Sequence, residues 1–380
     1  LYLLGTEASE AADLLEWEYA LELNQQLLDY LISKPDGDND PRTAAVYHQF
    51  GVIAQQRSGG TGLAEAEEWI RRSLAIIEQG EHREAVADDY YILGQIRLYQ
   101  RRYADATEWF SKSLDIHQRL QDAEEMIKDY RALGLADQYR FEHDKAESWY
   151  QRAREIVEEN RDEETAALIY HELATVYLSR YQFDEAENWY RQALTLSDQQ
   201  GKEQQMAVEF HHLGLVAQMR GIDYENAEDW YTLALEMRER LGDRRGMGDE
   251  ARQMGVLFQE QKRWDEAEQW YQQAREIFEE LQDVSRTART YGQLGMVAEE
   301  RDNLPEALEW AARTYQLALD DSPASTHSEG GNTGGLLVQV KSHLARLRDK
   351  QGAESFAQWW RFHMGSDPPT DLDVDTSHIL

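Results

Sequence analysis

The sequence contains no cysteine and only six prolines among its 380 residues. The absence of cysteine excludes disulfides, thiolate nucleophiles and Cys-ligated zinc sites. Basic residues are also scarce, with 39 Lys and Arg against 73 Asp and Glu, which gives a formal net charge of −34. Such a charge repels phosphate backbones and anionic lipid surfaces. We therefore expect no direct binding to nucleic acid.

Long apolar runs are missing as well. No stretch approaches the ~18 residues needed to span a bilayer, and no signal-peptide pattern of charged and then apolar residues opens the chain. We expect a protein that does not bind membranes and that resides in the cytoplasm. The sequence begins with Leu1 and not with methionine, which leaves open that it is a piece of a longer protein.

Motifs of common enzyme classes are absent too. There is no Gly-x4-Gly-Lys-[Ser/Thr] phosphate-binding loop, since the Gly201-Lys202 pair is followed by Glu203. His171 and Glu172 lack the second histidine of a zinc-protease helix, and no Gly-x-Ser-x-Gly elbow occurs. The carboxylates form charge runs typical of solvated helix faces. We predict a non-enzymatic protein without a metal or a cofactor.

Tryptophan, by contrast, recurs at a nearly fixed distance along the chain. Successive members of one set lie 40 or 41 residues apart: Trp69, Trp109, Trp149, Trp189, Trp230, Trp270 and Trp310. A large residue followed by Gly or Ala keeps step with them: Phe50-Gly51, Leu93-Gly94, Leu133-Gly134, Leu173-Ala174, Leu213-Gly214, Met254-Gly255 and Leu294-Gly295. We call this Gly or Ala the marker. The regularity indicates a repeated structural unit of about 40 residues.

Within one unit, the order of residue types is that of a tetratricopeptide repeat. Tyr90, Leu93 and Gly94 give aromatic-x2-Leu-Gly on a first helix, and Ala106 and Phe110 give Ala-x3-aromatic on a second. A marker without a large side chain lets the two helices cross closely. We predict seven such pairs, with helices of roughly 16 to 19 residues.

Acidic residues mark the predicted start of the second helix in several repeats. Asp144, Asp184 and Asp265 each precede a Glu by three residues. This spacing is typical of a capping box, whose first residue is the N-cap of the helix. We expect these three aspartates to be N-caps.

The domain organisation follows from the extent of the repeats, which occupy residues 44–320. Residues 1–43 predict an N-terminal helix and a loop. Residues 321–335 are rich in Ser, Gly and Thr and predict a flexible linker. Residues 336–364 predict a capping helix pair, and residues 365–380 an acidic, disordered tail.

The repeats resemble the bacterial tetratricopeptide arrays with long units marked by Trp-Tyr, as in Asp184-Glu-Ala-Glu-Asn-Trp-Tyr-Arg-Gln-Ala-Leu194. They are similar to the arrays of kinesin light chains and to the C-terminal sensor arrays of STAND-type signal-transduction ATPases. The resemblance implies an all-α fold, a right-handed α-solenoid of seven tetratricopeptide-type helix pairs with an N-terminal helix and a C-terminal capping helix pair. It also implies a module that binds a protein or peptide.

In tetratricopeptide folds the first helix of each pair lines a concave face, and the residue three before the marker points into it. This predicted row comprises His48, Tyr91, Arg131, His171, His211, Arg252 and Gly292. One or four residues after a marker lie the amides Gln95, Gln138, Gln218 and Gln259. Five of the seven row residues are His or Arg, which suits an acidic partner segment. The alternative, which the sequence leaves open, is that these side chains only hydrogen-bond to neighbouring helices.

Two functions therefore remain for the chain. The first is a non-enzymatic scaffold or sensor module that holds a protein or peptide in the concave groove. The alternative is a regulatory subunit or C-terminal sensor region that controls an effector domain, such as an ATPase, protease or nuclease, elsewhere in the polypeptide or complex. The genomic open reading frame would distinguish them.

Overall fold

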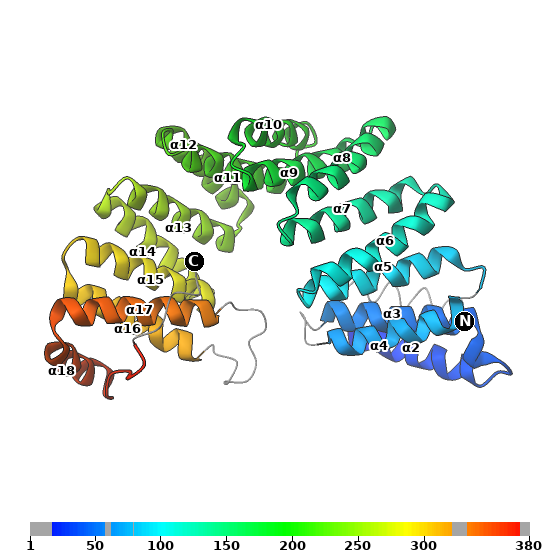
Figure 1. Ribbon diagram of the computed structural model, residues 1–380, viewed down its shortest axis with the longest axis horizontal. Helices are drawn as coiled ribbons and strands as arrows, with labels where there is room; N and C mark the ends of the chain where they lie inside the picture. The colour runs from blue at the N-terminus through cyan, green and yellow to red at the C-terminus, as the bar shows by residue number, and fades with distance from the viewer. Residues whose placement is uncertain (1–16, 58–61, 79, 321–332, 373–380) are drawn as a thin grey trace. The chain divides into compact units, whose positions relative to one another are not determined.

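The computed structural model describes residues 17–57, 62–78, 80–320 and 333–372, and it contains no strand in these ranges (Figure 1). The helices are α2 (Trp17–Ile32), η1 (Gly37–Asn39), α3 (Pro41–Arg57), α4 (Leu63–Ile77), α5 (Arg83–Tyr99), α6 (Tyr103–Leu120), α7 (Ala123–Tyr139), α8 (His143–Asn160), α9 (Glu163–Ser179), α10 (Phe183–Gln199), α11 (Glu203–Arg220), α12 (Tyr224–Leu241), α13 (Arg244–Glu260), α14 (Trp264–Glu280), α15 (Val284–Glu300), α16 (Leu304–Asp320), α17 (Thr333–Gln351) and α18 (Ala353–Met364). Within the described ranges, none of these helices has both the length and the apolar character that crossing a bilayer requires.

Helices α3 to α16 form the seven predicted pairs, and the tetratricopeptide-type fold is confirmed. Their lengths run from 15 residues in α4 to 18 residues in α6, α8, α11 and α12. The long repeat therefore lengthens both helices of a pair, as expected from the absence of a proline that would end the second one.

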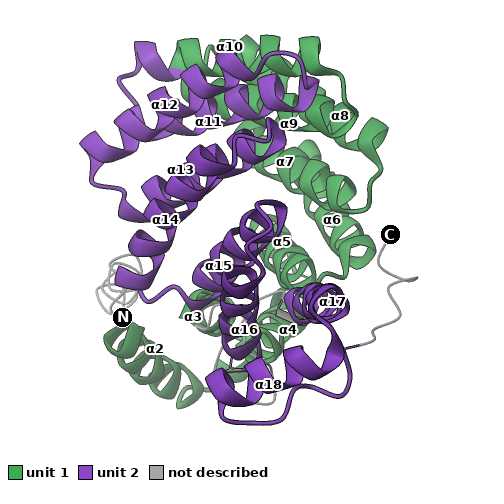
Figure 2. Cartoon of the chain, turned by 90° about the vertical axis from the view of Figure 1, so that its left-hand side faces the viewer, with its two compact units in different colours: residues 1–196 green, residues 197–380 purple. Residues whose placement is uncertain are grey.

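The chain divides into two compact units, residues 1–196 and residues 197–380 (Figure 2). In the first unit, helix pairs stack through contacts such as α6 with α7 and α8 with α9. In the second unit, α12 packs on α13, α14 on α15 and α16 on α17. Each unit is therefore a stack in which a repeat contacts its neighbours along the chain.

In four pairs the crossing is made by a glycine marker and an aromatic ring, and in the first pair Ile70 takes the place of the ring beside Gly51. A Cβ atom added to Gly134 would lie 2.6 Å from Cε1 of Tyr150, which is fully buried. The ring thus fills the space that a side chain at the marker would need. The fourth pair accommodates one methyl group at this point, because its marker is Ala174.

Six of the seven repeated tryptophans lie beside this crossing and pack on an aromatic residue of the first helix, whereas Trp270 has Ala251 at that position. The ring centroids of Tyr130 and Trp149 are 5.9 Å apart, with an angle of 24° between the planes. The corresponding values for Phe210 and Trp230 are 5.8 Å and 21°. These offset stacks belong to the packing of the helix pair.

The predicted N-caps are wrong. Helix α8 begins after Glu142, so Asp144 lies inside its first turn, where it is fully exposed and 2.7 Å from Arg180. An acidic residue in the first turn interacts favourably with the helix dipole without capping it, and the two roles look alike in a sequence. The side chains that do cap helices precede first helices of pairs; they include Asp40, which accepts from the backbone N–H of Arg42, and Asp122, Asp162, Asp243 and Asp283.

The C-terminal region also differs from the prediction. Helix α17 already begins at Thr333, inside the expected linker, while residues 321–332 and 373–380 lie outside the described residues. Residues 365–372 do not form a separate tail. Leu372 is buried in the core of the capping helices, and Asp371 lies 2.5 Å from Lys341 on α17. One apolar side chain and one ion pair therefore hold the chain against α17.

We predict that Gly134→Val destabilises the protein by about 1 to 3 kcal/mol, because the new side chain must displace the buried ring of Tyr150. Denaturation in urea measures this change. The control is Gly292→Ala, whose Cβ would meet only Thr314, at 3.9 Å. Alanine is favoured over glycine inside a helix by roughly 0.5 to 1 kcal/mol, so the control should gain stability. Equal losses in both variants would contradict the assigned crossing.

Candidate functional site

The residues of the predicted row lie on first helices of pairs, and all seven are half-buried. Four of them, from His48 to His171, belong to the first unit, and three, from His211 to Gly292, belong to the second. The environment of each side chain decides whether it is available to a partner.

In the first unit, carboxylates of the following repeat hold two row residues. Nδ1 of His48 lies 2.7 Å from Oδ1 of Asp89. Nε and Nη2 of Arg131 donate to Oε1 of Glu172 at 3.1 and 2.7 Å, and Nε also reaches Oε2 at 3.1 Å. Such forked guanidinium–carboxylate contacts are among the strong hydrogen bonds of proteins. These two donors therefore link neighbouring repeats.

The charge of His48 depends on its partner. Burial alone would favour the neutral imidazole, but the hydrogen bond and the charge of the fully buried Asp89 outweigh it and raise the pKa of His48. The imidazolium is therefore stabilised in the folded chain.

The other row residues of this unit lie against aromatic rings. Tyr91 packs on Phe110 with centroids 5.4 Å apart, and burial raises the pKa of Tyr91. His171 meets Tyr190 edge-on at 5.4 Å. His171 and Gln138 also line a cavity of about 530 Å³, at whose edge Phe141 is 82% exposed. This cavity is the candidate surface of the first unit.

The predicted amides mostly serve the core. Gln218 and Gln259 accept hydrogen bonds from the hydroxyls of Tyr231 and Tyr271 at 2.7 Å. Gln138 accepts one from Tyr150 at 3.4 Å, and Gln95 accepts one from Gln55 at 3.1 Å. Three of these amides thus satisfy the hydroxyl of the ring that packs on the marker.

In the second unit, His211 is also paired. Its Nδ1 lies 2.9 Å from Oε2 of Glu250, and Nε of Arg238 donates to Oε1 of the same carboxylate at 2.9 Å. Glu250 is completely buried. A buried carboxylate is costly unless cations and hydrogen bonds surround it, and here two donors share it.

Glu250 belongs to a set of buried carboxylates that the sequence-based prediction did not include. Five residues before the marker, a buried acidic residue recurs in four of the seven repeats: Asp89, Asp129, Glu209 and Glu250. The periodicity was visible in the sequence. The pattern did not predict buried side chains because acidic residues in helices are ordinarily solvated.

Arg252 differs from the other cationic row residues, because it forms no hydrogen bond or ion pair with any residue that the structure describes. The seventh repeat, which follows Arg252 in the chain, explains why this arginine has no ion pair. Thr290 stands five residues before its marker and Gln293 two before it, at the positions from which Glu250 and Glu172 hold His211 and Arg131. Both replacements are neutral, so α15 offers no carboxylate at these two positions.

Arg252 lines a cavity of about 870 Å³ that helices α13, α15, α16 and α17 enclose in the second unit. Arg289 supplies another guanidinium to the cavity without a hydrogen bond or ion pair in the described part of the chain. Gly292 also lines the cavity and has no side chain to fill it. Met296 and Leu336 add apolar surface. The cavity therefore combines two available cations with an apolar wall.

The other basic side chains that line this cavity, His343 and Arg346, already contact Glu299. Glu299 lies 3.3 Å from Nη2 of Arg346, 3.0 Å from Nε2 of His343 and 2.8 Å from Nζ of Lys350. Burial is the largest influence on His343 and lowers its pKa, so its imidazole is neutral at neutral pH. The available positive charge thus comes from Arg252 and Arg289.

The comparisons with known proteins agree with this fold. The family model of the tetratricopeptide repeat matches residues 124–199 and 250–320. No curated protein sequence matches the chain. The resemblance to tetratricopeptide arrays is thereby confirmed for the matched segments.

Three solved structures are similar. The apo form of the quorum sensor NprR from B. thuringiensis is 15% identical, with a TM-score of 0.61 over 95% of this chain and 97% of that one. A STAND protein with a tetratricopeptide repeat sensor, PH0952 from Pyrococcus horikoshii, is 15% identical, with a TM-score of 0.60 over 90% of this chain and 52% of that one. BtubC (BKLC) from P. vanneervenii is 23% identical, with a TM-score of 0.52 over 59% of this chain and 93% of that one. At these identities the likeness shows the fold alone.

We predict that the stabilising effect of His48 depends on pH. Since pairing with Asp89 raises its pKa in the folded state, the contribution is fully present below the ordinary value of about 6.5 and is lost as pH rises through the folded-state value. His48→Gln should therefore lose more unfolding free energy at about pH 6 than at about pH 9, measured in urea. His82→Gln, at an exposed helix start without a side-chain capping bond, is the control. A deficit of His48→Gln that is the same at both pH values would contradict the charged pair.

Proposed function

Because residues 124–199 and 250–320 are tetratricopeptide repeats, we propose that this chain is a non-enzymatic scaffold or sensor module that binds an acidic protein or peptide segment. The observation that carries the proposal is the unpaired guanidinium of Arg252 in the cavity of the second unit. The cytoplasm remains the predicted location.

An unpaired arginine is informative in this chain because carboxylates are so abundant. With 73 acidic residues against 39 basic ones, most cations near a helix face can find a partner. His48, Arg131 and His211 have done so. Arg252 and Arg289 keep their donors for another molecule, and a planar guanidinium suits a carboxylate.

The other lining residues favour a peptide over a simple anion. Gln293, Gln339 and Ser342 can exchange hydrogen bonds with a peptide backbone, while Met296 and Leu336 can contact an apolar side chain. A volume of about 870 Å³ falls within the usual size of a ligand site. We infer a short segment in which a carboxylate lies near an apolar residue.

The wider predicted row has a different role in this proposal. His48, Arg131 and His211 connect repeats, and Gln218 and Gln259 hold buried tyrosines, so these residues shape the surface and do not contact the partner. In the first unit, His171 and Gln138 can contact a partner in the smaller cavity. Tyr91 and Gln95 do not line either cavity.

One comparison favours the alternative function, a sensor region that controls an effector domain such as an ATPase. The STAND protein from Pyrococcus horikoshii is described as having a tetratricopeptide repeat sensor, and 90% of this chain corresponds to 52% of that one. In such an arrangement the same cavity would bind the signal. A genomic reading frame that encodes an adjacent effector domain would support this alternative.

We predict that peptides selected from a random linear display library on the parent chain are enriched in Asp and Glu, and that Arg252→Gln and Arg289→Gln each weaken their binding. A charge-assisted hydrogen bond contributes about 1.5 to 3 kcal/mol, which corresponds to roughly a tenfold to hundredfold loss of affinity by calorimetry. Added salt should weaken binding as well.

The matched control is Arg313→Gln on α16, whose guanidinium already contacts Glu309 at 2.6 Å outside the cavity. It should bind the selected peptides like the parent. Arg131→Gln, in the other unit, should lower stability and leave this affinity unchanged. Equal affinity of the Arg252, Arg289 and Arg313 variants would exclude the cavity as the binding site.

A further inference from the structure

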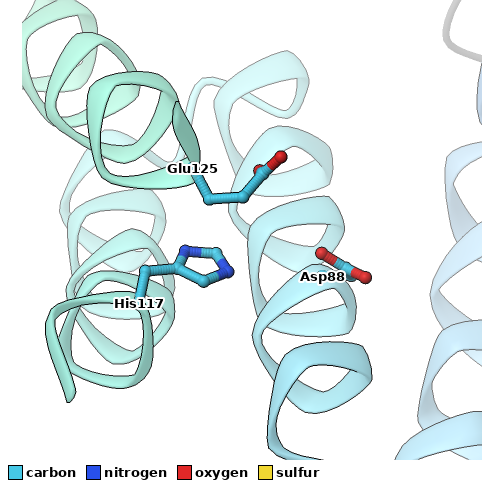
Figure 3. Close-up of side chains that lie close together, drawn as sticks. All are labelled: Asp88, His117 and Glu125. Carbon is cyan, nitrogen blue, oxygen red and sulfur yellow. The ribbon is translucent and has the colours of Figure 1, made fainter. Parts of the chain in front are cut away.

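Three side chains outside the predicted row converge in the first unit. Asp88 comes from α5, His117 from α6 and Glu125 from α7 (Figure 3). One potential ligand atom of each residue lies within 4.8 Å of those of the other two. The cluster therefore lies between the second and third helix pairs.

The imidazole of His117 is fixed by a carboxylate. Its Nδ1 lies 2.7 Å from Oδ2 of Asp129, and the two side chains are 1% and 0% exposed. A carboxylate accepts hydrogen bonds, so Nδ1 donates to Asp129, and Nε2 is the nitrogen that would offer a lone pair to a metal ion. A carboxylate bound to the far nitrogen of a histidine is the usual support of a metal-binding imidazole.

Nε2 of His117 is buried and has no hydrogen-bond partner among the described residues. It belongs to the cluster with the carboxylates of Asp88 and Glu125. A buried lone pair beside two negative groups is unfavourable unless a cation lies between them. A proton on Nε2 could be that cation, but Nε2 forms no hydrogen bond to Asp88 or Glu125 in this structure.

We propose that Asp88, His117 and Glu125 bind a divalent transition-metal ion such as Zn²⁺ or Mn²⁺, and that Asp129 positions His117. One imidazole nitrogen and two carboxylate oxygens form a mixed ligand set that suits these ions better than Mg²⁺ or Ca²⁺, which prefer oxygen alone. Three protein ligands leave coordination positions for water.

Lys128 is the cation nearest to this site on α7, and it does not replace the metal. Its Nζ lies 2.6 Å from Oε1 of Glu125 and 3.2 Å from Oε1 of Glu124, and its side chain is 44% exposed. The second oxygen of Glu125 remains for the ion. Lys128 thus neutralises part of the local negative charge from the solvent side.

Binding at this site would tie α5, α6 and α7 together. In a stack whose repeats contact only their neighbours, stability depends on each interface between repeats. An ion that binds the folded state alone stabilises it by mass action. The consequence is a metal-dependent rigidity of the second and third repeats.

The experiment uses the full chain without an affinity tag, after dialysis against a chelator. Calorimetry with Zn²⁺ and Mn²⁺ separately should show one equivalent bound per chain and an increase in Tm, and Co²⁺ should give visible absorption bands that differ from those of the aqueous ion. Asp88→Asn and Glu125→Gln should each weaken binding at least tenfold. Asp129→Asn should weaken it about 10- to 100-fold, because it removes the support of the imidazole. The control is Glu84→Gln, an exposed acidic residue of α5 with the same change in charge.

Three results would overturn the proposal. The first is weak binding of several metal ions per chain that excess Mg²⁺ displaces. Such ions would be bound to the acidic surface of the protein and not to the proposed site. The second is the same binding in Glu125→Gln and the parent; this variant suffices even if Asp88→Asn fails to fold. The third is a nitrogen NMR titration that shows Nε2 of His117 protonated up to about pH 8 while no metal binds, which would establish an imidazolium ion instead.

Discussion

In the second, third, fifth and sixth helix pairs, the crossing depends on an aromatic ring packed against a glycine marker. Tyr150 covers Gly134, and its hydroxyl also bonds to Gln138. The ring therefore does two things, since it sets the distance between the helices and it orients an amide on the first helix. Tyr231 with Gln218 and Tyr271 with Gln259 repeat this arrangement. Core packing thus positions Gln138, which lines the cavity of the first unit.

Buried carboxylates impose the second constraint. Asp89 and Glu250 are completely inaccessible, and each must be compensated by a donor from a neighbouring helix. Cationic side chains that the sequence predicts to contact a partner therefore pair with carboxylates between repeats instead. A cation becomes available only where the acidic position of the next repeat is neutral, as Thr290 is beside Arg252. The candidate site arises from this interruption of the internal pairing.

The sequence predicted the seven helix pairs because their signals, Trp and the marker, are local and recur at a constant spacing. It did not predict which donors are free. That depends on residues 39 to 41 positions away, whose side chains meet only after the repeats stack. The caps failed for a related reason, since Asp144 in a first turn and an aspartate at an N-cap share one sequence pattern. The cluster around His117 joins three helices, and no motif spacing records such a meeting.

Both proposed sites consist of departures from the repeat, and this follows from how a repeat array is stabilised. Residues that hold a pair together must recur in every pair, so they cannot distinguish one partner from another. His117 and Gly292 occupy positions where other repeats carry different residues. Because a repeat contacts only its neighbours, such a departure alters one interface and leaves the packing of the others intact. Specific chemistry can therefore reside in a single repeat while the common contacts maintain the fold.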